Sequence, residues 1–202
     1  MKHNYIATIN NETREATMRL YGVIGDKVDG DTFAQELASL DDLELDHIQL
    51  RINTPGGNVF QGMSIISAML SMRTPVHAYV DGVAASMGAI VAISAKKVCM
   101  ADFAKLMIHD PYFSSIDEST LSEKQLETLE SITEMLITVL ARRGQSKKNM
   151  AKLMSEETWL SADQAKRAGL CDEIIATTNI TIKNLSTMQL VSAVDAEYKA
   201  PE

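Results

Sequence analysis

The sequence predicts an α/β domain with parallel strands, and three observations support this class. Strand-like and helix-like segments alternate through residues 17–109, the order that a parallel sheet requires. Apolar residues make up 46% of the 202 residues, so the chain is able to bury a substantial core. A segment of small residues at positions 82–89 runs into a longer apolar stretch, which is typical of a buried helix.

The first half of the chain is expected to alternate between strands and helices. Residues 47–53 place Ile48, Leu50 and Ile52 on one face, as in a strand, and Thr54-Pro55-Gly56-Gly57 ends it. Further strands are predicted at residues 17–25, 75–80, 97–100 and 104–109. Helices are predicted at residues 31–40, at residues 58–72 with Met63, Ile65, Ile66 and Leu70 buried, and directly after Ser86.

A long amphipathic helix is predicted over residues 118–143, because apolar residues recur at helical spacing from Leu126 to Leu140. Ser122 begins a capping box, Ser119 is an alternative cap, and Gly144 is the expected C-terminal cap. The residues leave open whether this helix packs in the core or projects as an oligomerisation arm. Short helices at 146–154 and 161–168, a strand at 171–175 and an appendage at 178–202 complete the prediction.

Composition excludes several classes of protein. The net charge of −8 leaves no basic patch for nucleic acid, and the apolar run at residues 83–95 is too short to span a membrane. The N-terminus has no apolar region of the kind found in secretory signals. Cys99 and Cys171 suggest no disulfide framework, so a reducing cytoplasm is expected, and the absence of a Cys/His cluster argues against a zinc site.

Ser86 is the first candidate for chemistry. It lies among Gly, Ala and Val residues at the start of a predicted helix, where the Oγ is reachable and backbone N–H groups are free. A serine nucleophile beside an oxyanion site is built in this way. The structural alternative is a close contact of small residues between a helix and a strand.

Four histidines are candidates for the base that such a serine needs. His3 is expected in a frayed terminus and His47 in solvent at the start of a strand. His77 occupies an alternate position inside a strand, where a structural and a functional role are equally open. His109 ends a predicted strand and precedes Asp110-Pro111, which places it at the carboxyl edge of the sheet, where sites of α/β proteins lie. His109 is therefore either a base or a structural turn residue.

An acid and a second source of N–H groups are also required. Asp110 is too close in sequence to His109 to reach its ring. Composition does not choose among the downstream carboxylates, which are Glu156, Glu157, Asp163 and Asp172. Gly56 and Gly57 are able to turn their amides outward, although two glycines also mark ordinary turns.

Four motifs occur in one order that resembles ClpP, the proteolytic subunit of the Clp protease. They are Arg51–Gly57 followed by Gly62–Ile65, then Gly82–Ala89, then Met107–Pro111, and last Leu160–Ala162 with Gly169–Asp172. The resemblance runs from about Leu20 to Ile175 and is greatest to the ClpP-like head-maturation (prohead) proteases of phages and prophages.

The resemblance implies a spiral of ββα units, shared with the crotonase superfamily, in a protease domain at residues 1–177. Residues 118–143 then form the family's handle helix, which packs rings of subunits face to face. Ser86 corresponds to the nucleophile, His109 to the general base, and Gly57 and Met87 to the oxyanion N–H donors. Glu157 stands where the family usually has Asp, with Glu156 as its neighbour. No metal or organic cofactor is implied.

The main expectation is a cytoplasmic serine endopeptidase that acts on a protein or peptide and assembles into rings, with no nucleic-acid or membrane partner. A crotonase-type acyl-CoA enzyme and a non-catalytic subunit of a ring or capsid assembly are the alternatives. Thr54 replaces the serine of housekeeping ClpP, a change expected to be harmless. The stretch before Leu20 does not resemble the family's axial-loop segment, which argues against docking to an AAA+ unfoldase.

Overall fold

A mixed sheet of eight strands organises the fold in the computed structural model, which describes residues 4–113 and 120–176. The strands are β1 (Ile6–Asn10), β2 (Glu15–Tyr21), β3 (His47–Thr54), β4 (Val76–Ala85), β5 (Lys97–Ala101), β6 (Lys105–Ile108), β7 (Thr158–Ser161) and β8 (Glu173–Ile175). The helices are α1 (Gly30–Ser39), η1 (Asp41–Leu43), α2 (Val59–Ser71), α3 (Met87–Ser94), α4 (Glu123–Leu140), η3 (Ala141–Arg143), α5 (Lys147–Ser155) and α6 (Ala162–Arg167). The predicted α/β class is confirmed.

Most neighbouring strands are parallel, as the alternation of strands and helices predicts. The order β2-β3-β4-β5-β8 is parallel throughout, and β6 also pairs with β4 in parallel. Two antiparallel strands were not predicted: β1 pairs with β2, and β7 pairs with β6. Both gave weak signals, because β1 buries none of its residues fully and β7 has only four residues.

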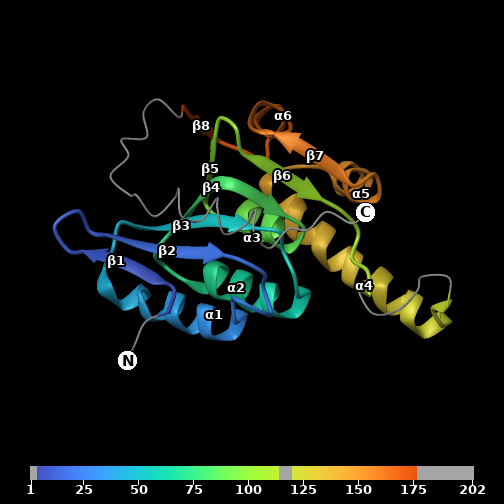
Figure 1. Cartoon of the computed structure of the whole chain (residues 1–202), viewed down its shortest axis with the longest axis horizontal. Helices are drawn as coiled ribbons and strands as arrows, with labels where there is room; N and C mark the ends of the chain where they lie inside the picture. Colours follow the sequence, from blue (N-terminus) through green and yellow to red (C-terminus); the bar gives the residue numbers. More distant parts are fainter. Residues whose placement is uncertain (1–3, 114–119, 177–202) are drawn as a thin grey trace, which may run out of the picture.

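The core lies between the sheet and the helices (Figure 1). Alternate residues of β2 and β3 are buried, and every residue of α3 from Met87 to Ile93 is buried. In α2 the buried stripe is Gly62, Ile65, Ile66 and Met69. The prediction that Leu70 is buried is wrong, because Leu70 follows this stripe by one residue and is 42% exposed.

Strand β4 changes its partner along its length, and this change positions the site. Residues 77–80 pair with β5, whereas residues 83–85 pair with β6. Ala85 at the end of β4 is opposite Met107 in β6. The residues that follow these two strands, Ser86 and His109, therefore emerge at the same edge of the sheet.

Helix α4 is anchored at one end only. Leu136, Val139 and Leu140 are buried, whereas Leu126 near the other end is 47% exposed, and Figure 1 shows that end projecting away from the sheet. The Ser122–Gln125 capping box and the Gly144 cap are confirmed, while Ser119 lies outside the described residues. The C-terminal half of this helix therefore packs in the core, whereas its N-terminal end projects from the molecule.

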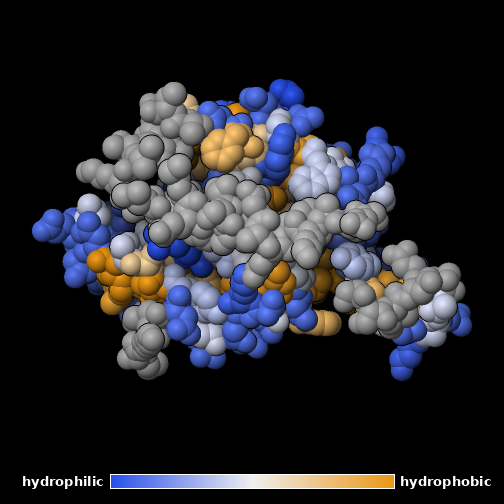
Figure 2. Space-filling model, in the orientation of Figure 1, coloured by the Kyte–Doolittle hydropathy of each residue, from blue (hydrophilic) through white to orange (hydrophobic). Residues whose placement is uncertain are grey.

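The surface along α1 and α2 is largely hydrophilic in Figure 2. Cys99 and Cys171 are free and buried. Among residues 4–113 and 120–176, no helix is long and apolar enough to cross a membrane. The predicted appendage at residues 178–202 lies outside the described part of the chain.

Candidate active site

Ser86 occupies a strained turn between β4 and α3. Its backbone has φ 52° and ψ −127°, a conformation that a residue with a side chain rarely adopts. The Ser86 N–H donates to the Met107 carbonyl at 2.9 Å, so β6 holds the turn in place. A sharp turn from strand to helix is a known way to expose a serine Oγ at the top of a sheet.

His109 lies directly against this serine. Its Nε2 is 2.7 Å from the Ser86 Oγ, and the ring is partly buried. The Tyr112 ring lies beside it, with centroids 5.5 Å apart. The structure therefore brings together the serine and the histidine that the sequence singles out, 23 residues apart in the chain.

The glycine loop after β3 packs against the serine turn. The buried Thr54 hydroxyl accepts the Gly56 N–H at 3.0 Å and donates to the Gly22 carbonyl at 2.6 Å. A Cβ at Gly56 would lie 2.7 Å from the Ser86 Cβ. Only glycine permits this approach, which brings the loop beside Ser86 and Met87.

Two backbone N–H groups at this contact, those of Gly57 and Met87, form no hydrogen bond within the described residues. The Ile24 N–H donates to the Gly56 carbonyl, and the Ile24 carbonyl accepts the Asn58 N–H. Neither of these hydrogen bonds uses the Gly57 N–H, which lies between them in the chain. Met87 begins α3, where N–H groups have no partner within the helix. The Met87 side chain is buried against Gly62, so only its backbone faces the site.

Of the four candidate acids, only Glu157 lines the cavity that holds Ser86 and His109. Asp172 instead pairs with Arg143 at 2.5 Å, and Glu156 lies 3.8 Å from Lys152. Glu157 has φ 44°, and its carboxylate accepts the Trp159 indole N–H at 3.4 Å. Within the described residues, no hydrogen bond joins Glu157 to His109.

Asp110 also lines this cavity, directly after His109. Burial raises the pKa of Asp110, and the neighbouring His109 only partly offsets the effect. Asp110 therefore holds a proton more readily than a solvated carboxylate does.

The cavity has a volume of about 1010 Å³ and is walled by residues that the sequence did not single out. Leu129 and Ile132 come from α4, Met154 from α5, and Phe60 from the start of α2. Phe60 is 68% exposed. An exposed large apolar side chain indicates a binding surface, and this exposure is visible only in the structure. The periodicity of these helices predicts burial and cannot reveal a shared cavity.

The remaining histidines lie elsewhere. His47 and His77 stack with ring centroids 4.6 Å apart. The expectation that His47 is solvated is wrong, because this stacking and the neighbouring Glu15 leave its side chain only 18% exposed. His3 lies outside the described residues, and among the residues that are described no group of His, Cys, Asp and Glu could hold a metal ion.

A serine paired with histidine on a strained strand–helix turn, beside free backbone N–H groups, is the arrangement of a serine hydrolase. The model of the Clp protease family matches residues 2–178, and the chain therefore belongs to this family. The resemblance inferred from the four motifs is thereby confirmed. Its closeness to the phage proteins stays a prediction.

Curated relatives agree with this assignment. An ATP-dependent Clp protease proteolytic subunit from Streptococcus sanguinis is 32% identical over 142 residues, which cover 66% of this chain and 71% of the relative. That of Streptococcus gordonii is 28% identical over 176 residues, covering 83% and 88%. Proteolytic subunit 1 of Chlamydia abortus is 30% identical over 133 residues, covering 63% and 69%.

Proposed function

We propose that this protein is a serine endopeptidase in which Ser86 is the nucleophile and His109 the general base. The observation that carries the proposal is the 2.7 Å contact between His109 Nε2 and the Ser86 Oγ in a cavity large enough for a peptide. Membership of the Clp protease family supports it over the acyl-CoA and non-catalytic alternatives.

The reaction follows from the positions of these atoms. His109 Nε2 takes the hydroxyl proton as the Ser86 Oγ attacks the peptide carbonyl, and then returns the proton to the leaving amine. Water hydrolyses the acyl-enzyme in the same way, with His109 again as base. The Nδ1 of His109 carries its own proton throughout and needs an acceptor, for which Glu157 is the candidate.

The negative charge on the tetrahedral intermediate needs donors on one side of the serine. The Gly57 and Met87 N–H groups are proposed for this role, because neither has a hydrogen-bond partner in the described part of the chain and the glycine loop packs against Ser86. Loss of one such donor typically costs about 3–4 kcal/mol of transition-state stabilisation.

We further propose that the protein acts in the cytoplasm as a ring of identical subunits of the phage type, without an AAA+ unfoldase. The projecting half of α4 supports self-assembly, and the unfamiliar stretch before Leu20 supports independence from an unfoldase. Cleavage of an unfolded protein such as casein is then expected without ATP or an ATPase. A strict requirement for a Clp ATPase would contradict this part of the proposal.

A fluorophosphonate probe tests the catalytic proposal directly, because it labels activated serines. The parent protein is expected to be labelled and to cleave casein, whereas Ser86→Ala is expected to do neither and to melt at the same temperature. Ser94→Ala is the matched control, since Ser94 lies at the end of α3 and should retain labelling. Persistent labelling of Ser86→Ala would show that the nucleophile is misassigned.

A further inference from the structure

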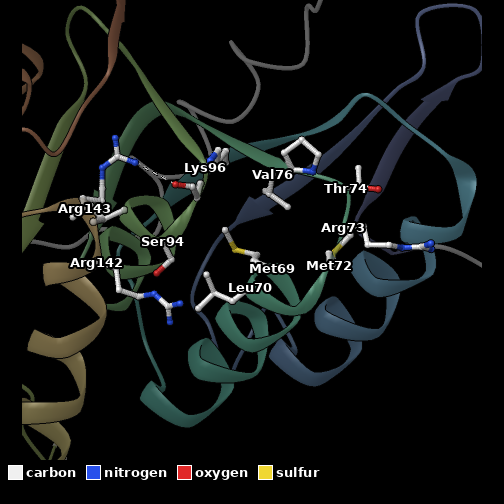
Figure 3. Close-up of a pocket in the computed structure, with 13 residues that line it drawn as sticks. Met69, Leu70, Met72, Arg73, Thr74, Val76, Ser94, Lys96, Arg142 and Arg143 are labelled. Atoms are coloured by element: carbon white, nitrogen blue, oxygen red, sulfur yellow. Dashed lines mark hydrogen bonds between the residues drawn. The ribbon is translucent and has the colours of Figure 1, made fainter.

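A second cavity, of about 660 Å³, opens at the edge of the sheet opposite to Ser86 (Figure 3). It lies where β4 begins at Val76, whereas Ser86 follows the last residue of that strand. Its apolar part comes from the end of α2, with Met69 and Met72, and from Ile93 in α3. The proposed mechanism uses none of these residues.

The residues that line this cavity carry positive charge only. They include Arg73, Lys96, Arg142 and Arg143 and no Asp or Glu, although the whole chain has a net charge of −8. Arg143 is occupied by Asp172, and it also donates to the Ala95 carbonyl. Lys96 and Arg142 form no ion pair within the described residues. Both residues line the cavity, and Figure 3 shows that they come from separate segments of the chain.

A complementary surface lies next to this cavity on the same molecule. It is formed by η1 and the residue after it, and Arg73 at the cavity's edge contacts its first two residues, Asp41 and Asp42. The Asp42 side chain is 90% exposed, and Leu43 is 46% exposed. Glu44 follows with an exposed side chain that forms no ion pair in the described part of the chain. Two carboxylates thus flank one unburied leucine.

We propose that the acidic η1 segment of a second copy of this chain docks in this cavity. Leu43 of one copy covers the apolar floor, while Asp42 and Glu44 face Lys96 and Arg142 of the other. Charge complementarity and matching apolar surface support this choice of occupant. Because the two surfaces are adjacent, two copies are able to exchange them reciprocally about a two-fold axis. The inference does not depend on the proposed peptidase activity.

Disulfide trapping tests the contact between two chains that each carry one introduced cysteine, with the native Cys99 and Cys171 replaced by serine in both. Leu43→Cys and Leu70→Cys chains are co-expressed and oxidised with copper phenanthroline, and mixed dimers are followed on non-reducing gels. Leu70 lines the cavity and is 42% exposed, whereas Phe103, 57% exposed and outside the cavity, supplies the control Phe103→Cys. The Leu43–Leu70 dimer is expected to form at least about tenfold faster than the control.

Charge reversal then tests the pairing. Lys96→Glu/Arg142→Glu in the Leu70→Cys chain is expected to slow trapping about tenfold, and Asp42→Lys/Glu44→Lys in the Leu43→Cys chain is expected to restore it. Trapping no faster than the control, no effect of the first reversal, or no restoration by the second would each overturn the inference. Thermal melts show whether each variant is folded. Fluorophosphonate labelling of Ser86 tests the peptidase proposal independently of this contact.

Discussion

At the residue scale, the proposed chemistry depends on a few positions where the backbone is unusual. Ser86 and Glu157 have positive φ angles although both carry side chains, and Gly57 has φ 134°. Such conformations cost free energy and persist because the surroundings hold them. Here those surroundings are β6, the end of α5 and Ile24.

Replacement of Glu157 tests the proposed acid. Glu157→Gln is expected to lower kcat by roughly 10³–10⁴-fold with little change in melting temperature, because the His109 imidazolium loses its orienting charge. Glu156→Gln is the matched control and is expected to leave kcat nearly unchanged, because Glu156 lies outside the cavity beside Lys152. The rate of casein cleavage, measured as a function of pH, gives kcat for each of the two variants. A large loss in Glu156→Gln alone would reverse the assignment.

Replacement of Gly57 tests the glycine loop. A Cβ there would lie 2.1 Å from the Ile24 carbonyl oxygen, so Gly57→Ala is expected to destabilise the fold by at least about 3 kcal/mol and to abolish labelling of Ser86. Gly144→Ala, also at positive φ but with open space around it, should cost only about 1–2 kcal/mol. Urea denaturation compares the two. Equal effects would show that backbone conformation alone matters at Gly57.

At the element scale, the two halves of α4 differ in how they contact the rest of the protein. Its C-terminal half is held by buried residues, and its middle supplies Leu129 and Ile132 to the cavity of Ser86. Its N-terminal end has a complete capping box, and Leu126 near this end is 47% exposed. Because packing rather than propensity stabilises most helices, the two halves should differ in stability.

Two leucines of α4 test this difference. Leu140 is fully buried, so Leu140→Ala is expected to destabilise the protein by about 2–5 kcal/mol. Leu126 is 47% exposed, and Leu126→Ala should change stability by less than about 0.5 kcal/mol in the separated protomer. Urea denaturation measures both. A large loss for Leu126→Ala would mean that this end of α4 is buried against another part of the molecule.

At the scale of the whole molecule, polar contacts join β2, β3 and β4 on the face of the sheet opposite to their buried residues. The Asp81 carboxylate on β4 accepts the Tyr21 hydroxyl at 2.5 Å and the Arg51 Nε at 3.0 Å, which ties three neighbouring strands together. Burial, and secondarily the charge of Asp81, raise the pKa of Tyr21. The His47–His77 stack lies on the same side.

The free energy of unfolding is expected to decrease at acidic pH, because His77 is harder to protonate in the folded protein than in the unfolded chain. Burial first, and then His47 and Lys97, lower the pKa of His77 from its ordinary value of 6.5. The unfolded chain therefore binds this proton more readily, and folding loses stability as the pH falls below 6.5. Urea midpoints at pH 8 and pH 5 are expected to differ less in His77→Gln than in the parent. An equal difference would show that His77 does not contribute.

Much of the fold was predictable because local patterns and the fold agree. The alternation at Ile48, Leu50 and Ile52, the capping box at Ser122 and the Gly144 cap each express a local rule that the structure keeps. Strands β1 and β7 were missed because pairing with a neighbour, rather than their own pattern, makes them strands. Leu70 was misplaced because a helix pattern alone does not define the limits of its buried stripe.

The sequence by itself determined the α/β class, the candidate serine and histidine, and the resemblance that the family match confirms. Only the tertiary structure decided that Ser86 and His109 are in contact, that Glu157 alone among the four candidate acids lines their cavity, and that α4 and α5 wall it. The reason is physical. Motifs record local conformation, whereas the partner change along β4 and the packing of distant helices depend on contacts that no single segment contains.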